Sequence, residues 1–158
     1  MVEIRLNDVS QMFEGREVLH QLTCSFQGGR VTAVAGANGS GKSTLLRLAA
    51  RLMLPTSGTI DTLLDGTPVN GADYRRLLAM ATPEMELYTR LTVRENLAFL
   101  LSVRGVPCEE SHLADLLTRV GLPTEVLNRK TGQLSTGMRQ RVRLAVLLGS
   151  DAEVWLLD

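Results

Sequence analysis

The chain of 158 residues carries 17 Lys and Arg against 17 Asp and Glu, a net charge of +0. A chain of this length supports about one domain with a core of its own, and the charge balance argues against a general nucleic-acid binder. Cys24 and Cys108 lie far apart and match no metal-ligand spacing, which is typical of reduced thiols in a cytosolic protein. No apolar run approaches the roughly 20 residues that span a bilayer, so a membrane role would require a partner.

The first 35 residues predict strands. Val2–Leu6 and Leu22–Phe26 alternate apolar and polar residues, the pattern of half-buried strands. Gly28 and Gly29 predict a turn, and the aliphatic and small residues of Val31–Ala35 predict a buried strand after it.

Residues 36–43 read Gly-Ala-Asn-Gly-Ser-Gly-Lys-Ser, the pattern of a phosphate-binding loop between a strand and a helix. The glycines let the backbone approach a polyphosphate closely, backbone N–H groups bind its oxygens, and the next helix adds its positive dipole end. Lys42 supplies a charge for the β and γ phosphates, and the Ser43 hydroxyl can ligate Mg²⁺. The alternative is a plain glycine-rich turn with a surface lysine. We predict a nucleotide-binding set of Gly36, Ala37, Asn38, Gly39, Ser40, Gly41, Lys42, Ser43 and Thr44.

Beyond the loop, a helix is expected over Thr44–Leu54, with Leu45, Leu48 and Leu52 on one face. Short strands are expected at Thr59–Ile60, Leu63–Leu64 and Leu77–Ala81. Asp65 and Gly66 give a turn signal.

The second half of the sequence predicts helices. Thr92-Val93-Arg94-Glu95 is a capping box, so a helix should follow over Val93–Arg104. Further helices are expected at Glu109–Val120 and Thr136–Leu148. Val154–Asp158 predicts a hydrophobic strand that ends in a carboxylate.

Residues 134–141 read Leu-Ser-Thr-Gly-Met-Arg-Gln-Arg and resemble the signature sequence of ATP-binding cassette (ABC) ATPases, commonly Leu-Ser-Gly-Gly-Gln before a basic helix. The segments 56–60, 65–66 and 91–97 match the same family in order, so the resemblance covers essentially the whole chain. It implies an α/β P-loop NTPase core, a mixed β-sheet with helices on both faces, with an N-terminal antiparallel β subdomain and a small α-helical subdomain. The expected parts are a β-rich core at 1–91, a helical subdomain at 92–131, and the signature helix with the Asp-ending strand at 132–158.

The resemblance implies ATP and Mg²⁺ as cofactors and assigns further residues. Phe13 would stack on adenine, and Asp158 would orient Mg²⁺ together with Ser43. Ser135 and Gly137 would face the γ-phosphate bound to a second ATPase subunit, in a homo- or heterodimer closed by ATP and opened by hydrolysis. Lys42 would stabilise charge in the transition state.

Three departures from the family pattern stand out. Thr136 and Met138 replace a glycine and a glutamine of the signature, a form that resembles ABC-2 exporters of drugs, sodium or polysaccharides. The family's metal-ligating Gln falls at Pro83, or at Glu84 after a one-residue shift; Glu84 could ligate Mg²⁺ or be a solvated loop residue. The chain also stops at Asp158, before the family's catalytic Glu and switch His. We therefore expect a C-terminally truncated piece that binds ATP and hydrolyses it poorly, because a general base contributes roughly 10² to 10⁴ in rate.

The leading hypothesis is the ATPase subunit of an ABC transporter, on the cytoplasmic face of the membrane beside a separate transmembrane permease. The family docks its permease around residues 83–90 and the helical insert. A soluble ABC protein of translation or DNA maintenance is the alternative, and an unrelated phosphate-loop kinase or GTPase is a third. Neither a basic linker nor an Asn-Lys-x-Asp motif supports these two.

Overall fold

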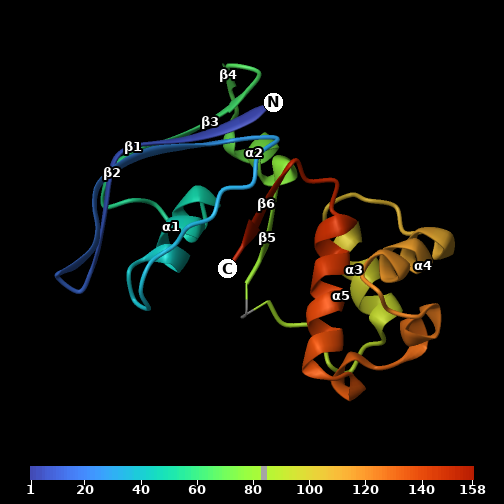
Figure 1. Ribbon diagram of the computed structural model, residues 1–158. Helices are drawn as coiled ribbons and strands as arrows, with labels where there is room; N and C mark the ends of the chain where they lie inside the picture. Colours follow the sequence, from blue (N-terminus) through green and yellow to red (C-terminus); the bar gives the residue numbers. More distant parts are fainter. Residues whose placement is uncertain (83–84) are drawn as a thin grey trace. The chain divides into compact units, whose positions relative to one another are not determined.

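The computed structural model describes residues 1–82 and 85–158, which form two compact units (Figure 1). Unit 1 comprises Met1–Met80 with Leu156–Asp158, and unit 2 comprises Ala81–Trp155. The predicted helical subdomain at 92–131 lies inside unit 2, together with the signature helix.

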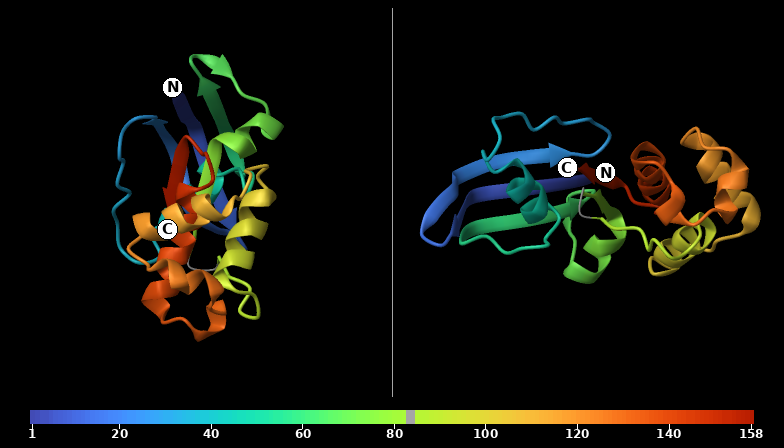
Figure 2. Two further views of the ribbon diagram at one scale, coloured as in Figure 1. Left: turned by 90° about the vertical axis from the view of Figure 1, so that its right-hand side faces the viewer. Right: turned by 90° about the horizontal axis from the view of Figure 1, so that it is seen from below.

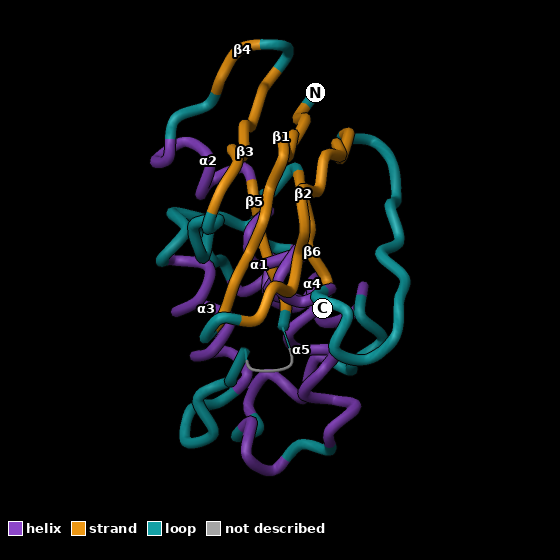
Figure 3. Tube along the Cα trace, turned by 90° about the vertical axis from the view of Figure 1, so that its left-hand side faces the viewer, coloured by secondary structure: helices purple, strands orange, loops and turns teal. Residues whose placement is uncertain are grey.

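Unit 1 is built on a four-stranded sheet in the order β2-β1-β3-β4, whose pairings are antiparallel (Figure 3). The strands are β1 (Val2–Phe13), β2 (Arg16–Gln27), β3 (Ser57–Leu64) and β4 (Thr67–Pro68). The predicted strand at Val2–Leu6 is confirmed, because Val2, Ile4 and Leu6 are buried. β1 and β2 run well beyond the predicted cores, since each pairs with a neighbour over most of its length.

Two tight turns set the register of this sheet. Glu14 and Gly15 connect β1 to β2 with φ of 47° and 80°, and Asp65 and Gly66 connect β3 to β4 with φ of 48° and 81°. Positive φ at both central residues is the requirement of a type I′ hairpin turn. The turn predicted at Asp65–Gly66 is confirmed.

Helix α1 (Lys42–Ala49) lies on one face of the sheet and buries Leu45, Leu48 and Ala49 (Figures 1 and 2). It is shorter than the predicted helix at Thr44–Leu54, and Leu52 is 68% exposed rather than part of the apolar face. The cause lies at Arg51, which adopts a left-handed conformation with φ of 53°. Its guanidinium donates to Ile60 O and Thr62 Oγ1, each at 3.3 Å, and stacks on the Tyr74 ring at 4.7 Å. Tyr74 belongs to α2 (Gly71–Leu77), which no sequence pattern had indicated.

The predicted buried strand at Val31–Ala35 is wrong. Residues 31–37 are irregular, and Val31 is 101% exposed. Within the described ranges, no backbone hydrogen bond joins this stretch to a neighbouring strand. A strand exists only through such pairing, and Ala33 and Ala35 favour it weakly because alanine presents little side chain to a pleated surface.

The strands predicted at Leu77–Ala81 and Val154–Asp158 are confirmed as β5 (Leu78–Ala81) and β6 (Val154–Leu157), which form a two-stranded sheet. Asp158 follows β6 directly.

Unit 2 is a helical bundle of α3 (Val93–Ser102), α4 (Glu110–Arg119) and α5 (Thr136–Leu148), with short 3₁₀ helices η1 (Thr124–Asn128) and η2 (Thr131–Gln133). The predicted capping box is confirmed: Thr92 Oγ1 accepts from the Glu95 amide at 3.2 Å, and Glu95 Oε2 accepts from the Thr92 amide at 2.7 Å. The backbone bond from Thr92 lowers the pKa of the Glu95 carboxyl. The core of the bundle includes Leu97, Leu101, Leu116, Leu117 and Val142, all of which are fully buried.

Candidate functional site

The loop of residues 36–41 adopts a conformation that depends on glycine. Gly39 and Gly41 have φ of 80° and 90°, in the left-handed region where side chains are strained. A Cβ on Gly36 would lie 2.6 Å from Ser40 Oγ. Gly41 is the N-cap of α1, and no side chain caps that helix end. The first N–H groups of α1 are therefore available for an anion, as the phosphate-loop prediction requires.

The side chain of Lys42 folds back onto the loop that precedes it. Its Nζ donates to Gly36 O at 3.1 Å and to Ala37 O at 2.8 Å. Ser40 N also donates to Ala37 O at 3.2 Å, which closes the turn. The ammonium group thus rests on uncharged carbonyls at the place where phosphate oxygens would be stronger partners.

The two predicted metal ligands meet in unit 1. Ser43 Oγ, in the first turn of α1, donates to Asp158 Oδ1 at 2.8 Å, although 115 residues separate them in sequence. A hydroxyl and a carboxylate are oxygen ligands of the kind that Mg²⁺ binds together with substrate phosphates. The described residues contain no cluster of three or more His, Cys, Asp and Glu side chains fit to hold a metal alone. The pair therefore suits a metal that the protein shares with a phosphate.

Phe13 ends β1 and is 42% exposed. The phosphate loop packs on the neighbouring strand β2, because a Cβ on Gly41 would lie 3.0 Å from both Val18 Cγ1 and Leu19 Cδ2. Leu19 is opposite Gln11 of β1, so Phe13 lies two residues, about 7 Å, further along the same strand. Phe13 is therefore an exposed ring on the strand that pairs with β2, and an aromatic ring on that strand suits contact with a nucleotide base. The contact of Gly41 with Val18 and Leu19 had no signal in the sequence.

The signature residues lie at the start of α5 in unit 2. Ser135 is its N-cap, and its Oγ accepts from the Met138 amide at 3.2 Å. Gly137 has open space where a side chain would be. Two basic residues further along α5 bind backbone carbonyls: Arg141 donates to Gly121 O at 2.9 Å, and Arg143 donates to Met85 O at 2.6 Å.

Pro83 and Glu84, the two alternatives for the metal-ligating loop position, lie outside the described residues. Their predicted role is untested. Among the described residues, no helix has both the length and the apolar character needed to cross a membrane.

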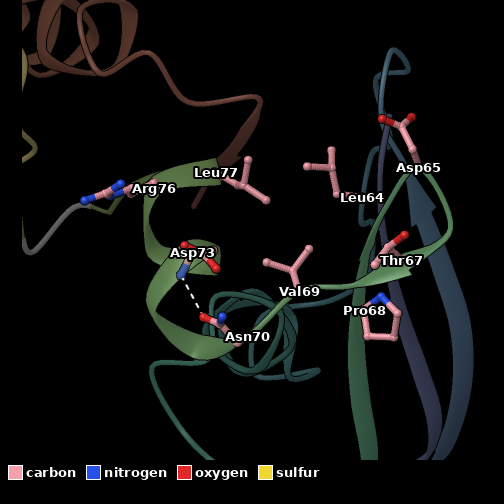
Figure 4. Close-up of a pocket in the computed structure, with 9 residues that line it drawn as sticks. All are labelled: Leu64, Asp65, Thr67, Pro68, Val69, Asn70, Asp73, Arg76 and Leu77. Carbon is pink, nitrogen blue, oxygen red and sulfur yellow. Dashed lines mark hydrogen bonds between the residues drawn. The ribbon is translucent and has the colours of Figure 1, made fainter.

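A separate hollow of about 650 Å³ lies between the β3–β4 hairpin and α2 (Figure 4). Leu64, Val69 and Leu77 form its apolar part, and Asp65, Asp73 and Arg76 are on its rim. Its polar groups build the local fold: Asp65 binds the amino group of Met1, and Asn70 Oδ1 accepts from the Asp73 amide at 3.1 Å. It shares no lining residue with the phosphate loop.

Comparison with known proteins identifies the family of this chain. The family model described as "ABC transporter" matches residues 19–158. The sn-glycerol-3-phosphate import ATP-binding protein UgpC of Paracoccus denitrificans is 36% identical over 161 residues, covering 100% of this chain and 45% of that protein. The sulfate/thiosulfate import ATP-binding protein CysA of Thermosynechococcus vestitus is 38% identical and covers 98% and 46%. The chain thus spans about half the length of these curated relatives.

Solved structures agree on the fold. A putative ABC transporter ATP-binding protein from Pyrococcus furiosus aligns with a TM-score of 0.84 at 28% identity, over 99% of this chain and 74% of that one. The dimeric bacterial ABC transporter cassette MJ0796 aligns with a TM-score of 0.81 at 27% identity, over 98% and 73%. These similarities confirm the predicted α/β P-loop fold with its antiparallel and helical parts.

Proposed function

Because this chain belongs to the ABC transporter family, we propose that it is the nucleotide-binding part of a subunit that hydrolyses ATP to drive transport. The observation that supports this most is the meeting of Ser43 with Asp158 beside the glycine loop of residues 36–41. A phosphate cradle, the ammonium group of Lys42 and a pair of oxygen ligands together suit a magnesium-bound nucleoside triphosphate. ATP hydrolysis is proposed for the whole protein.

Lys42, Ser43, Asp158 and Phe13 have distinct roles in this proposal. Lys42 exchanges the carbonyls of Gly36 and Ala37 for the β and γ phosphate oxygens, and its charge then stabilises charge that develops during hydrolysis. Ser43 and Asp158 would hold Mg²⁺, and the metal would neutralise phosphate charge. Phe13 stacks on the adenine ring, which adds affinity without selecting the phosphates.

Ser135 and Gly137 serve a second subunit. The N-terminus of α5 presents backbone N–H groups and a positive dipole end, and the absence of a side chain at Gly137 lets an anion approach. We place the γ-phosphate of the partner's ATP there, so that two nucleotides join two subunits. The neighbour MJ0796 is described as dimeric, which supports this arrangement. Such closure works only if ATP binds the closed dimer more tightly than the separated subunits.

The membrane partner is proposed to dock on unit 2. Tyr88 and Phe99 are 51% and 46% exposed and pack edge to face, with ring centroids 5.4 Å apart. Exposed aromatic pairs of this kind are frequent anchors at protein interfaces. A subunit held in this way would lie on the cytoplasmic face of the membrane, next to its permease.

The signature sequence and the names of the relatives point to opposite directions of transport. The signature variant at Thr136 and Met138 predicts export, whereas UgpC and CysA are named as import proteins. The exporter subclass therefore stays a prediction.

The test uses ATP-driven dimerisation of the whole protein, measured by sedimentation velocity with ATP and Mg²⁺. The wild type should form dimers, and Ser135→Arg should remain monomeric while it still binds ATP, because the arginine blocks the second subunit's phosphate site. Ser111→Arg, at an exposed serine on α4, is the matched control and should dimerise normally. Dimers of the Ser135 variant, or a wild type that stays monomeric, would contradict the proposal.

A further inference from the structure

A buried polar cluster in unit 2 connects two segments that border the proposed sites. The first segment, Met85–Thr92, is here called the strap; it carries the exposed Tyr88 and leads into α3. The second is the turn Arg129–Leu134, which leads into Ser135. The cluster is formed by Asn96 of α3 and Thr131 of η2, and both side chains are 0% exposed.

Asn96 holds the middle of the strap. Its Oδ1 accepts from the Tyr88 amide at 2.7 Å, and its Nδ2 donates to Tyr88 O at 3.1 Å and to Thr92 O at 2.9 Å. Its Nδ2 also lies 3.4 Å from Thr131 Oγ1. One amide group therefore satisfies backbone groups of the strap and reaches the turn that precedes the signature.

Thr131 holds the same strap from the other side. Its Oγ1 donates to Tyr88 O at 2.7 Å, with Leu91 O at 3.3 Å, and its amide donates to Leu91 O at 3.0 Å. The next residue continues the contact, since the Gly132 amide donates to Thr89 O at 3.1 Å and a Cβ on Gly132 would lie 3.0 Å from that oxygen. The strap and the turn are thus in direct backbone contact.

The turn leads directly into the signature residues, so the position of the turn determines the position of Ser135. The Leu134 amide donates to Thr131 O at 3.2 Å, Leu134 is buried, and Ser135 follows as the cap of α5. α5 also contacts the strap further along, where Arg143 donates to Met85 O. A second hydrogen bond, from Arg143 to Gln140 Oε1 at 3.0 Å, orients the guanidinium group. Hydrogen bonds therefore connect the strap both to the turn that precedes α5 and to the middle of α5.

We infer that Thr131, with Asn96, is a positioning residue that sets where Ser135 stands at the proposed phosphate site of the second subunit. A buried hydroxyl and amide that bind the same carbonyls leave the turn little freedom, because each broken bond would leave a buried polar group unpaired. Both side chains belong to unit 2, whereas the phosphate loop belongs to unit 1. The inference rests on the proposed function of Ser135 and names the residues that make that site rigid.

The experiment measures ATP-driven dimerisation of the whole protein for Thr131→Val, which keeps the shape of the side chain and removes its hydroxyl. We expect the ATP concentration for half-maximal dimer to rise about tenfold, equivalent to about 1.4 kcal/mol for each bound ATP. ATP binding by the monomer should not change, because the phosphate loop belongs to unit 1. Thr131→Ser, which retains the hydroxyl, should restore dimerisation.

A general loss of stability is separated from positioning by Val126→Ala, a buried apolar truncation in η1. This control should lower the unfolding temperature and leave dimerisation unchanged well below that temperature. Equal weakening by Val126→Ala and Thr131→Val would overturn the inference, as would normal dimerisation of Thr131→Val. If Thr131→Val does not fold, Asn96→Asp, which removes the donors to the strap, must give the same selective loss. A wild type that does not dimerise would instead contradict the proposed function.

Discussion

Replacing Tyr74 by Phe tests the contact that ends the phosphate-loop helix. Tyr74 is 2% exposed, its ring stacks under Arg51, and its hydroxyl donates to the carbonyl of Ala49, the last residue of α1. Phenylalanine keeps the ring and removes only the hydroxyl. The lost hydrogen bond should destabilise unit 1 by about 1 kcal/mol at neutral pH.

Burial raises the pKa of Tyr74 from 10.0 to about 12, and the nearby Arg51 opposes that rise. Below pH 10 both the folded and the unfolded chain carry the phenolic proton, so stability does not depend on it. Above pH 10 the unfolded chain releases the proton first, and the stability of the folded state falls as the pH rises toward 12. A pKa difference of about two corresponds to at most about 2.7 kcal/mol, of which about 2 kcal/mol is lost by about pH 11.5.

The two effects predict a reversal. The wild type should be more stable than Tyr74→Phe by about 1 kcal/mol near pH 9, and less stable by about 1 kcal/mol near pH 11.5. Urea unfolding followed by circular dichroism at both pH values measures the difference, and comparing the variants cancels every other titrating group. A stability difference that is the same at both pH values would show that the Tyr74 hydroxyl does not titrate with a raised pKa.

Two further predictions concern the nucleotide. Phe13→Ala should weaken ATP binding by about 1 to 3 kcal/mol, because the stacking contact is lost, and should leave tripolyphosphate binding unchanged. Titration calorimetry with both ligands would measure the two affinities. An equal loss for both ligands would remove Phe13 from the site. Ser43→Ala should lower ATP affinity at least about tenfold with Mg²⁺ present and have little effect with the metal chelated, because only a metal ligand is lost. If the variant binds ATP equally well under both conditions, Ser43 does not hold the metal.

Features with a local cause could be predicted from the sequence. The capping box at Thr92 and Glu95 and the turn at Asp65 and Gly66 depend on residues a few positions apart, and both were predicted correctly. The phosphate loop is equally local, since its glycines and Lys42 are contiguous. The meeting of Ser43 with Asp158 could be expected only from the order of motifs, because no local rule relates residues so far apart.

Features that depend on tertiary pairing could not be predicted. The apolar stretch Val31–Ala35 has a strand-like composition, but its structure depends on whether another strand pairs with it. The early end of α1 depends on Arg51, which binds groups in β3 and α2. Asn96 left one weak signal: it lies three residues after Val93, on the apolar face of α3, where a polar residue needs buried partners.

The proposed function depends on the binding of ATP phosphates by the loop of residues 36–43. Titration calorimetry of ATP with Mg²⁺ into the wild type, Lys42→Ala and the matched control Lys130→Ala tests it most directly. Lys130 is an exposed lysine of unit 2. We expect binding by the wild type and by Lys130→Ala, and loss of measurable binding in Lys42→Ala. Unchanged ATP affinity in Lys42→Ala would contradict the assignment of the phosphate loop, and with it the proposed function.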